Sequence, residues 1–164
     1  MTASLLSLGT MFQLGYVTND LEAAVDDFGE RLGVRDFHIV DVGAAAGKPV
    51  PHGARIAMAW SGATMVELIQ PLGEPAPVYV DDLAPPGDLV VKFNHVGLTV
   101  PEEGRWRIML DRLAEHGLEV AWRGSDPARL DVAYVDARAT LGHYVEFIRD
   151  CPAIRELMAR VPHN

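Results

Sequence analysis

Apolar side chains recur at helical spacing in two segments of the chain. The first segment has five apolar residues on one helical face: Leu21, Ala24, Val25, Phe28 and Leu32. Asn19 and Glu22 are placed as a capping pair before this segment, and Gly33 follows it as a stop signal. The second segment has the same spacing in Trp106, Met109, Leu110 and Leu113, and it ends at Gly117. The pattern predicts one amphipathic helix in each half of the chain.

Short β-branched and apolar stretches surround both helices. The pattern predicts strands at about 37–42 and 54–60 in the first half, and at about 118–122 and 130–136 in the second. Five of the eleven prolines lie in the segment 71–86, which favours a connector over a helix or a central strand. The segment 43–53 is rich in Ala, Gly and Pro and is expected to be a mobile loop.

The two halves also match each other in sequence. Gln13-Leu-Gly-Tyr-Val has its counterpart 82 residues later in His95-Val-Gly-Leu-Thr, and a predicted helix follows each stretch. Each half closes on an apolar strand with one central glutamate, Glu67 in Met-Val-Glu-Leu-Ile and Glu146 in Tyr-Val-Glu-Phe-Ile. Each half therefore reads β-α-β-β-β, which predicts an α+β protein built from tandem βαβββ modules.

This reading gives one domain over residues 1–164. Module one covers about 11–70, the Pro-rich connector 71–91, module two about 92–150, and a C-terminal helix about 152–160. The helix carries apolar residues on one side for packing on the core or on a second subunit.

Composition narrows the classes of partner. The 164 residues include 14 Lys and Arg against 23 Asp and Glu, for a formal net charge of −9. Such a surface repels phosphate backbones and anionic lipids, and no Lys/Arg run counters it, so we expect neither a nucleic-acid nor a membrane partner. No stretch of about 20 apolar residues or signal-peptide pattern is present, and the single Cys151 forms no internal disulfide. A cytoplasmic protein is expected.

Four polar residues occupy equivalent places in the two modules: Gln13 and His95 on the first strands, Glu67 and Glu146 on the last. Each glutamate shares its strand face with apolar neighbours, and burial of an unpaired carboxylate costs several kcal/mol. An imidazole, an amide oxygen and two carboxylates can compensate one another by converging on a divalent cation.

Simpler explanations exist for each residue taken alone. A strand histidine is more often a structural residue than a ligand, and a buried glutamate can pair with an arginine such as Arg55 or Arg138. Their joint occurrence at equivalent positions favours the metal site. His143 lies three residues before Glu146, and this odd spacing turns it to the opposite strand face.

The sequence resembles the vicinal oxygen chelate superfamily, which includes glyoxalase I, methylmalonyl-CoA epimerase, extradiol dioxygenases and bleomycin resistance proteins. Four strand signatures carry the resemblance over about residues 11–150: Phe12-Gln-Leu-Gly-Tyr-Val, Val66-Glu-Leu-Ile, Asn94-His-Val-Gly-Leu and Gly142-His-Tyr-Val-Glu-Phe-Ile. The resemblance implies modules that form a U-shaped mixed sheet around a metal-binding cavity.

The resemblance also implies a ligand set of Gln13, Glu67, His95 and Glu146 for one divalent ion, with Zn, Ni, Co, Mn and Mg all compatible. Gln, Glu, His and Glu in this order match the eukaryotic type of glyoxalase I. The pattern of methylmalonyl-CoA epimerase has His first and Gln second, so this chain departs from it at both first-module positions. Dioxygenases place two histidines and one carboxylate on iron.

The expected function is that of a metal-dependent lyase or isomerase of the glyoxalase I/epimerase type, which stabilises an enediolate of a carbonyl substrate with adjacent oxygens. Glu146 is expected to act as the catalytic base, with Glu67 as ligand and second base. The alternatives are a non-catalytic ligand-binding or resistance-type protein of the same fold and, third, an extradiol-type dioxygenase. The expected partners are a small carbonyl compound, with a thiol adduct of glutathione or CoA left open, and a second copy of the chain in a homodimer.

Overall fold

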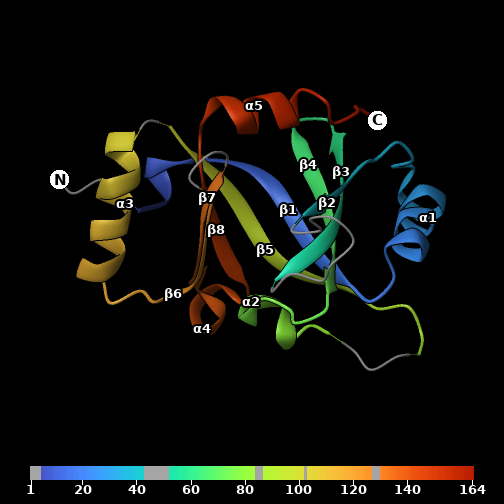
Figure 1. Cartoon of the computed structure of the whole chain (residues 1–164), viewed down its shortest axis with the longest axis horizontal. Helices are drawn as coiled ribbons and strands as arrows, with labels where there is room; N and C mark the ends of the chain where they lie inside the picture. The colour runs from blue at the N-terminus through green and yellow to red at the C-terminus, as the bar shows by residue number, and fades with distance from the viewer. Residues whose placement is uncertain (1–4, 43–51, 84–86, 102, 127–129) are drawn as a thin grey trace. The chain divides into compact units, whose positions relative to one another are not determined.

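The computed structural model describes residues 5–42, 52–83, 87–101, 103–126 and 130–164 (Figure 1). It divides into two compact units. The first-half unit comprises Gln13–Asn94 and Arg160–Asn164, and the second-half unit comprises Met1–Phe12 and His95–Ala159. The predicted loop 43–53 lies outside the described residues except for its last two positions.

The first-half unit contains one four-stranded mixed sheet. Its elements are β1 (Thr10–Thr18), α1 (Leu21–Leu32), β2 (His38–Val42), β3 (Gly53–Ser61), β4 (Thr64–Leu72) and α2 (Pro77–Val80). The strand order is β2-β3-β4-β1, in which β1 and β4 are parallel and the other neighbours are antiparallel.

The second-half unit repeats this arrangement. Its elements are the 3-10 turn η1 (Leu5–Leu8), β5 (Val91–Val100), α3 (Glu103–Glu115), β6 (Val120–Asp126), β7 (Leu130–Asp136), α4 (Arg138–Leu141), β8 (Tyr144–Arg149) and α5 (Pro152–Met158). The strand order is β5-β8-β7-β6, again with the first and last strands of the module parallel. The α+β class and the tandem βαβββ order are therefore confirmed.

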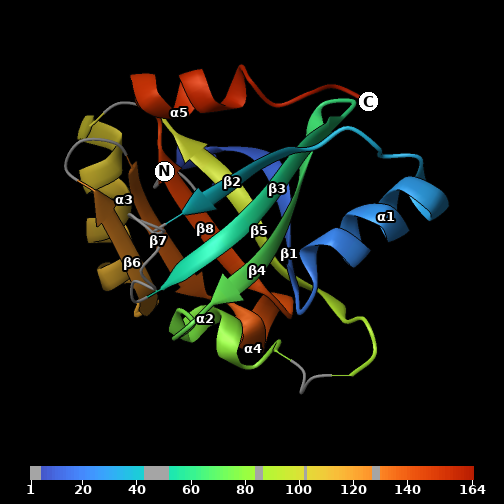
Figure 2. The same cartoon turned by 45° about the vertical axis from the view of Figure 1, so that its right-hand side comes forward.

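One face of each sheet packs beneath a helix (Figure 2). In the first-half unit, Leu21, Ala24 and Phe28 of α1 cluster with Ala57 and Leu68 of the sheet. In the second-half unit, α3 covers its sheet through a cluster that includes Trp106, Met109, Leu113, Val145 and Phe147. Because side chains alternate across a strand, Glu67 and Glu146, next to Leu68 and Phe147, belong to the opposite faces.

The start of α1 differs from the prediction. The N-cap is Asp20, whose side chain accepts a hydrogen bond from Ala23 N at 3.0 Å, whereas Asn19 was the predicted cap. Asn19 instead donates to Asp88 O at 3.0 Å and accepts from Val90 N at 2.9 Å. The predicted stop is correct, since Gly33 has a left-handed backbone with φ of 74°.

The predicted connector is more structured than expected. β4 extends through Pro71 to Leu72, and the short helix α2 follows with Pro77 in its first turn. Proline is tolerated there because the N–H of a first-turn residue has no partner within the helix. The prolines therefore shorten the helix without excluding it.

The last residues of the chain join the first-half unit. Trp60 N donates to Pro162 O at 2.8 Å, and Asn164 N donates to Trp60 O at 2.9 Å. The Asn164 side chain accepts hydrogen bonds from Arg35 N and Asp36 N at 2.7 and 2.9 Å and donates to Asp36 O. These bonds tie the end of β3 to the turn between α1 and β2. Within the described segments, no helix has the length and apolar character of a membrane span.

Candidate functional site

Gln13 and Glu67 lie on neighbouring parallel strands of the first-half unit. Gln13 of β1 is in register with Met65 of β4, and Gly15 is in register with Glu67. Residues in register, and those two positions along a strand, point to the same face. Gln13, Met65 and Glu67 therefore share the sheet face opposite α1.

The side-chain amide of Gln13 makes a hydrogen bond through its nitrogen and none through its oxygen within the described residues. Its Nε2 donates a hydrogen bond to the Sδ of Met65 at 3.9 Å. Its Oε1 is buried and accepts no hydrogen bond from the described residues. The amide therefore presents an unsatisfied oxygen, the end of a glutamine that coordinates cations.

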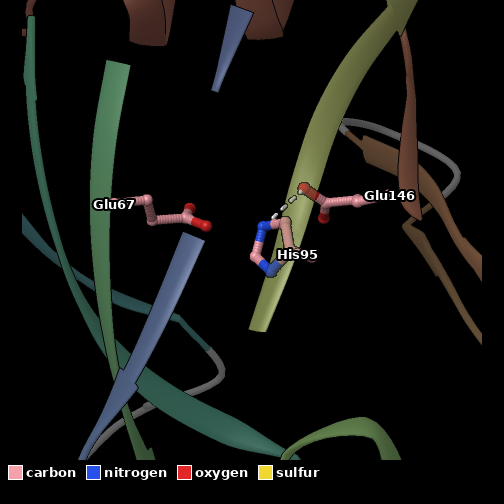
Figure 3. Close-up of side chains that lie close together, drawn as sticks. All are labelled: Glu67, His95 and Glu146. Atoms are coloured by element: carbon pink, nitrogen blue, oxygen red, sulfur yellow. Dashed lines mark ion pairs between the residues drawn. The ribbon is translucent and has the colours of Figure 1, made fainter. Parts of the chain in front are cut away.

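His95 and Glu146 form the corresponding pair in the second-half unit. The Nε2 of His95 on β5 lies 3.3 Å from the Oε2 of Glu146 on β8, and both side chains are buried (Figure 3). The edge of the His95 ring meets the ring of Tyr134, with centroids 5.1 Å apart and an interplanar angle of 78°. Tyr134 is also the register partner of Glu146 on β7. Tyr134 therefore lies beside both members of the pair, His95 and Glu146.

The two pairs occupy the same register in their sheets. His95 is in register with Tyr144, and Gly97 with Glu146, as Gln13 is with Met65 and Gly15 with Glu67. In each unit a polar side chain and a glutamate thus lie two residues apart on adjacent parallel strands. The residues that correspond in the sequence repeat therefore occupy equivalent strand positions in the two sheets.

All four side chains are removed from solvent. The exposed fractions are 3% for Gln13, 8% for Glu67, 0% for His95 and 6% for Glu146. Glu146 Oε2 is buried and receives no hydrogen bond from the described residues. A carboxylate oxygen in such a place costs several kcal/mol unless a positive charge or a donor compensates it. The donor set of carboxylate, amide oxygen and imidazole fits a divalent cation.

The two arginines considered as alternative partners form ion pairs elsewhere. Arg55 binds Glu22 at 2.6 Å and lies 3.4 Å from Asp41. The hydrogen bond from Arg55 is the main reason that the pKa of Glu22 lies below its ordinary value.

Arg138 performs the same role in the second-half unit. Its Nε and one terminal nitrogen bind the carboxylate of Asp136 at 3.0 and 2.7 Å, and this hydrogen bonding lowers the pKa of Asp136. The guanidinium also lies over the ring of Tyr144, 4.6 Å from its centroid.

His163 is exposed, and its ring stacks on Trp60 with centroids 5.7 Å apart and an interplanar angle of 11°. His143, left out of the predicted ligand set, lies before β8 with Nδ1 2.7 Å from Tyr144 O. Met65 was predicted only as a neighbour of Glu67 on the strand, and its contact with Gln13 is new. Strand alternation places Met65 on the face of Glu67, but the pairing with Gln13 follows from a strand register that the sequence pattern does not set.

Solved structures similar to this chain include several methylmalonyl-CoA epimerases and a hypothetical protein. The epimerase from Mycobacterium tuberculosis has a TM-score of 0.61 and 16% identity, with 95% of this chain and 96% of that one covered. The hypothetical protein, from Bacillus halodurans, has a TM-score of 0.60 and 15% identity over 87% and 95% of the two chains.

A variant of Streptomyces coelicolor methylmalonyl-CoA epimerase, in complex with 2-nitronate-propionyl-CoA, has a TM-score of 0.59 and 15% identity over 89% and 97%. At these identities the likeness establishes the fold. No curated protein matches the sequence.

The family model described as the glyoxalase/bleomycin resistance protein/dioxygenase superfamily matches residues 12–134. This match spans most of the chain, including the first strands of both modules, and it confirms the resemblance found in the strand signatures. The chain belongs to the glyoxalase/bleomycin resistance protein/dioxygenase superfamily.

Proposed function

We propose that Gln13, Glu67, His95 and Glu146 bind one divalent metal ion and that the protein is a metal-dependent isomerase or lyase of the glyoxalase I/epimerase type. The observation that carries the proposal is the repeated placement of a polar donor and a glutamate at the same register in both units. The buried oxygens Gln13 Oε1 and Glu146 Oε2, which receive no hydrogen bond from the described residues, support it. Zn, Ni, Co, Mn and Mg all accept this mixture of oxygen and imidazole donors.

A divalent ion in such a site supplies a Lewis acid that polarises the oxygens of a bound carbonyl compound. The substrate class that suits it is a carbonyl compound with adjacent oxygens. Gln13 and His95 would act only as ligands. Gln13 is neutral and held by Met65, and His95 is fixed by Tyr134 and Glu146.

Glu146 would move the proton. Its Oε2 takes the proton from the substrate carbon next to the carbonyl. A proton would then return either to the other side of the same carbon, from Glu67 in its carboxylic acid form, or to the neighbouring carbon, from the carboxylic acid of Glu146. The first outcome is an epimerisation and the second an isomerisation, and neither needs an oxidant or reductant. Glu67, at the equivalent register position of the first-half unit, is the second base.

The likeness of the fold to methylmalonyl-CoA epimerases supports an isomerase among the reactions of this superfamily. One similar structure is a methylmalonyl-CoA epimerase in complex with methylmalonyl-CoA, so a CoA thioester is one substrate to test. The ligand order matches glyoxalase I better, so a glutathione hemithioacetal of a 2-oxoaldehyde is the other.

The test has two stages. Purified protein is stripped with a chelator and reloaded with each of the five ions, and metal content is measured by elemental analysis. The protein with the highest occupancy is then incubated in D₂O with each of the two substrates, and deuterium incorporation is followed by NMR. We expect about one ion per chain and metal-dependent exchange into one of the substrates.

Other outcomes of the same test are informative. An ion bound without exchange into either compound favours a ligand-binding protein of this fold. Oxygen consumption with a catechol assigns the chain to the dioxygenase branch. Absence of metal uptake by the wild-type protein contradicts the proposal.

We also propose that the protein forms a homodimer. Ile154 and Val161 are buried within the chain, whereas Leu157 and Met158 of α5 are half-buried and leave apolar surface for a partner. We expect sedimentation velocity at micromolar to hundred-micromolar concentration to show a dimer that Leu157→Glu weakens. A wild-type monomer over this range contradicts the proposal.

A further inference from the structure

The two ends of a glutamine amide have almost the same shape but opposite hydrogen-bonding properties. The terminal torsion has a broad, two-fold preference, so hydrogen bonds decide which end faces a given direction. Only the oxygen end coordinates a cation. A glutamine ligand therefore needs a neighbour that distinguishes N–H from oxygen.

Met65 has the chemistry for this. Its thioether sulfur is an acceptor without a proton, so it binds the Nε2–H end of Gln13 and cannot bind the Oε1 end. The side chain is 1% exposed, which excludes competition by water at the sulfur. Met65 is in register with Gln13 on one neighbouring strand and with Trp60 on the other. The sheet therefore fixes the backbone of Met65 beside Gln13, and the hydrogen bond to Nε2 places the sulfur.

From this geometry we infer that Met65 is a positioning residue, which orients the Gln13 amide so that Oε1 is the end left for a metal ion. The inference rests on the proposed function, because that function supplies the metal ion that the amide oxygen would bind. It adds a residue whose side chain contributes no ligand atom of its own.

The second-half unit orients its donor residue by other contacts. A flip of the amide replaces the ligand oxygen with an NH₂ group that repels the cation, and a flip of an imidazole likewise replaces Nε2 with a C–H group. His95 has its ion pair with Glu146 and its ring contact with Tyr134. The position equivalent to Met65 is Tyr144, which is in register with His95. The Gln13 amide has the sulfur of Met65 as its partner in the first-half unit.

A double-mutant cycle tests the inference. The affinities for Zn²⁺ and Mn²⁺ alone are measured by calorimetry for wild type, Met65→Leu, Gln13→Glu and the double variant. Leucine fills about the volume of methionine but accepts no hydrogen bond. Glutamate at position 13 has two equivalent oxygens and needs no orientation. We expect Met65→Leu to weaken binding about tenfold in the Gln13 protein, the low end for loss of a partner to a ligand, and less than about twofold in the Gln13→Glu protein.

Met58→Leu is the matched control. Met58 is a buried methionine in register with Glu67 on the same sheet face. The same chemical change there should alter the affinity by the same factor in both backgrounds. An effect of Met65→Leu that is equally large in the Gln13→Glu background means a general packing role and overturns the inference.

The outcomes separate the two proposals. A wild-type protein that takes up none of the five candidate ions overturns the proposed metal site, and if it takes up neither Zn²⁺ nor Mn²⁺ the cycle is measured with the ion that it does bind. Metal uptake that Met65→Leu leaves unchanged overturns only the positioning role. If the Gln13→Glu protein does not fold, the side-chain ¹⁵N–¹H₂ resonances of Gln13 in the metal-free protein replace it. Met65→Leu should shift both proton resonances of that group and Met58→Leu should not, and an unchanged pair under Met65→Leu contradicts the inference.

Discussion

The first-half and second-half units share a backbone register but surround their glutamates with different side chains. In the first-half unit, Glu67 has Met58 as its register partner on β3, and Met65 is its same-face neighbour on β4. In the second-half unit, the equivalent neighbours of Glu146 are Tyr134 and Tyr144. Glu67 therefore has two flexible methionine side chains as neighbours, whereas Glu146 has two rigid tyrosine rings. Under the proposed function, this contrast predicts that Glu67 acts mainly as a ligand and that Glu146 is the group that also transfers the proton.

The largest expected effect separates the two glutamates. Glu146→Gln keeps an oxygen ligand but loses the base, so we expect solvent-deuterium exchange into the substrate to fall about 10² to 10⁴-fold. Glu67→Gln is the matched variant at the equivalent register position, and its loss should be smaller than about 100-fold. Both rates are measured by NMR at equal metal occupancy. Equal losses in the two variants would remove the proposed division between the units, and full exchange in Glu146→Gln would leave Glu67 as the base.

The next effect compares the two first-strand ligands. An imidazole is a stronger donor than a neutral amide oxygen for most of the candidate ions. We therefore expect His95→Ala to weaken metal binding more than about 100-fold and Gln13→Ala to weaken it about 10 to 100-fold. The reference is the loss in metal affinity, about 10 to 100-fold, when a residue that hydrogen-bonds a metal ligand is removed. Calorimetry with the metal alone measures both. Unchanged affinity in His95→Ala would show that the second-half pair is structural.

A smaller effect concerns the stability of the first-half unit. Asn164 makes four hydrogen bonds through its side chain, with Arg35 N, Asp36 N, Asp36 O and Trp60 O. Because the residue is exposed and water replaces part of this bonding, Asn164→Ala should lower the free energy of unfolding by only about 1 to 2 kcal/mol. Asn164→Asp keeps the acceptor and should lose about half as much. Hydrogen exchange should become faster at Arg35 and Asp36 and stay unchanged in the core around Phe147. Equal acceleration in both units would contradict this local role.

The smallest expected effect is the loss of folding stability from two surface ion pairs, Asp136–Arg138 and Glu22–Arg55, as the pH falls. The pKa of Asp136 is lowered in the folded protein by its hydrogen bonds to Arg138, so the pair stabilises the fold above the ordinary pKa of 3.8 and loses this contribution as the pH falls through the lowered value. Both side chains are about a third or more exposed, so the contribution is about 0.3 to 1 kcal/mol at neutral pH.

Urea unfolding of Arg138→Ala should therefore differ from wild type at pH 7 and approach it near pH 2. Arg55→Ala is the counterpart in the first-half unit and should have the same sign of pH dependence, because the hydrogen bond from Arg55 lowers the pKa of Glu22. Its effect should be the smaller, because Arg138 also stacks over Tyr144. A difference between Arg138→Ala and wild type that persists unchanged at pH 2 would assign the effect to that ring contact.

The module order was predictable because its signals are local. Helical spacing around Phe28 and strand alternation around Glu67 and Glu146 determine which face of each element is apolar. The four candidate ligands could be selected because the repeat places them at equivalent strand positions. Their joint action on one ion stays a prediction.

The sequence pattern fails where a residue far along the chain takes the hydrogen bonds of a side chain that a local motif would use. Asn19 has the side chain of an N-cap, but Asp88 and Val90, about 70 positions away, take its hydrogen bonds and leave the cap to Asp20. The stacking of the exposed His163 on Trp60 is a contact between distant positions that no local pattern predicts. The contact of Gln13 with Met65 likewise depends on strand register, which the sequence pattern alone does not set.

The course of β1 and β5 has a further consequence. Each of these strands begins in one unit and ends in the other, since the boundaries fall between Phe12 and Gln13 and between Asn94 and His95. A cut in the connector would leave each βαβββ module whole, but it would take the start of β1 from the second-half unit and the start of β5 from the first-half unit. Each half of the chain therefore contributes the opening residues of its first strand to the compact unit of the other half. Half of this chain transplanted into another protein would carry its four strands and its donor residue, and it would lack the strand segment that the other half supplies to its unit.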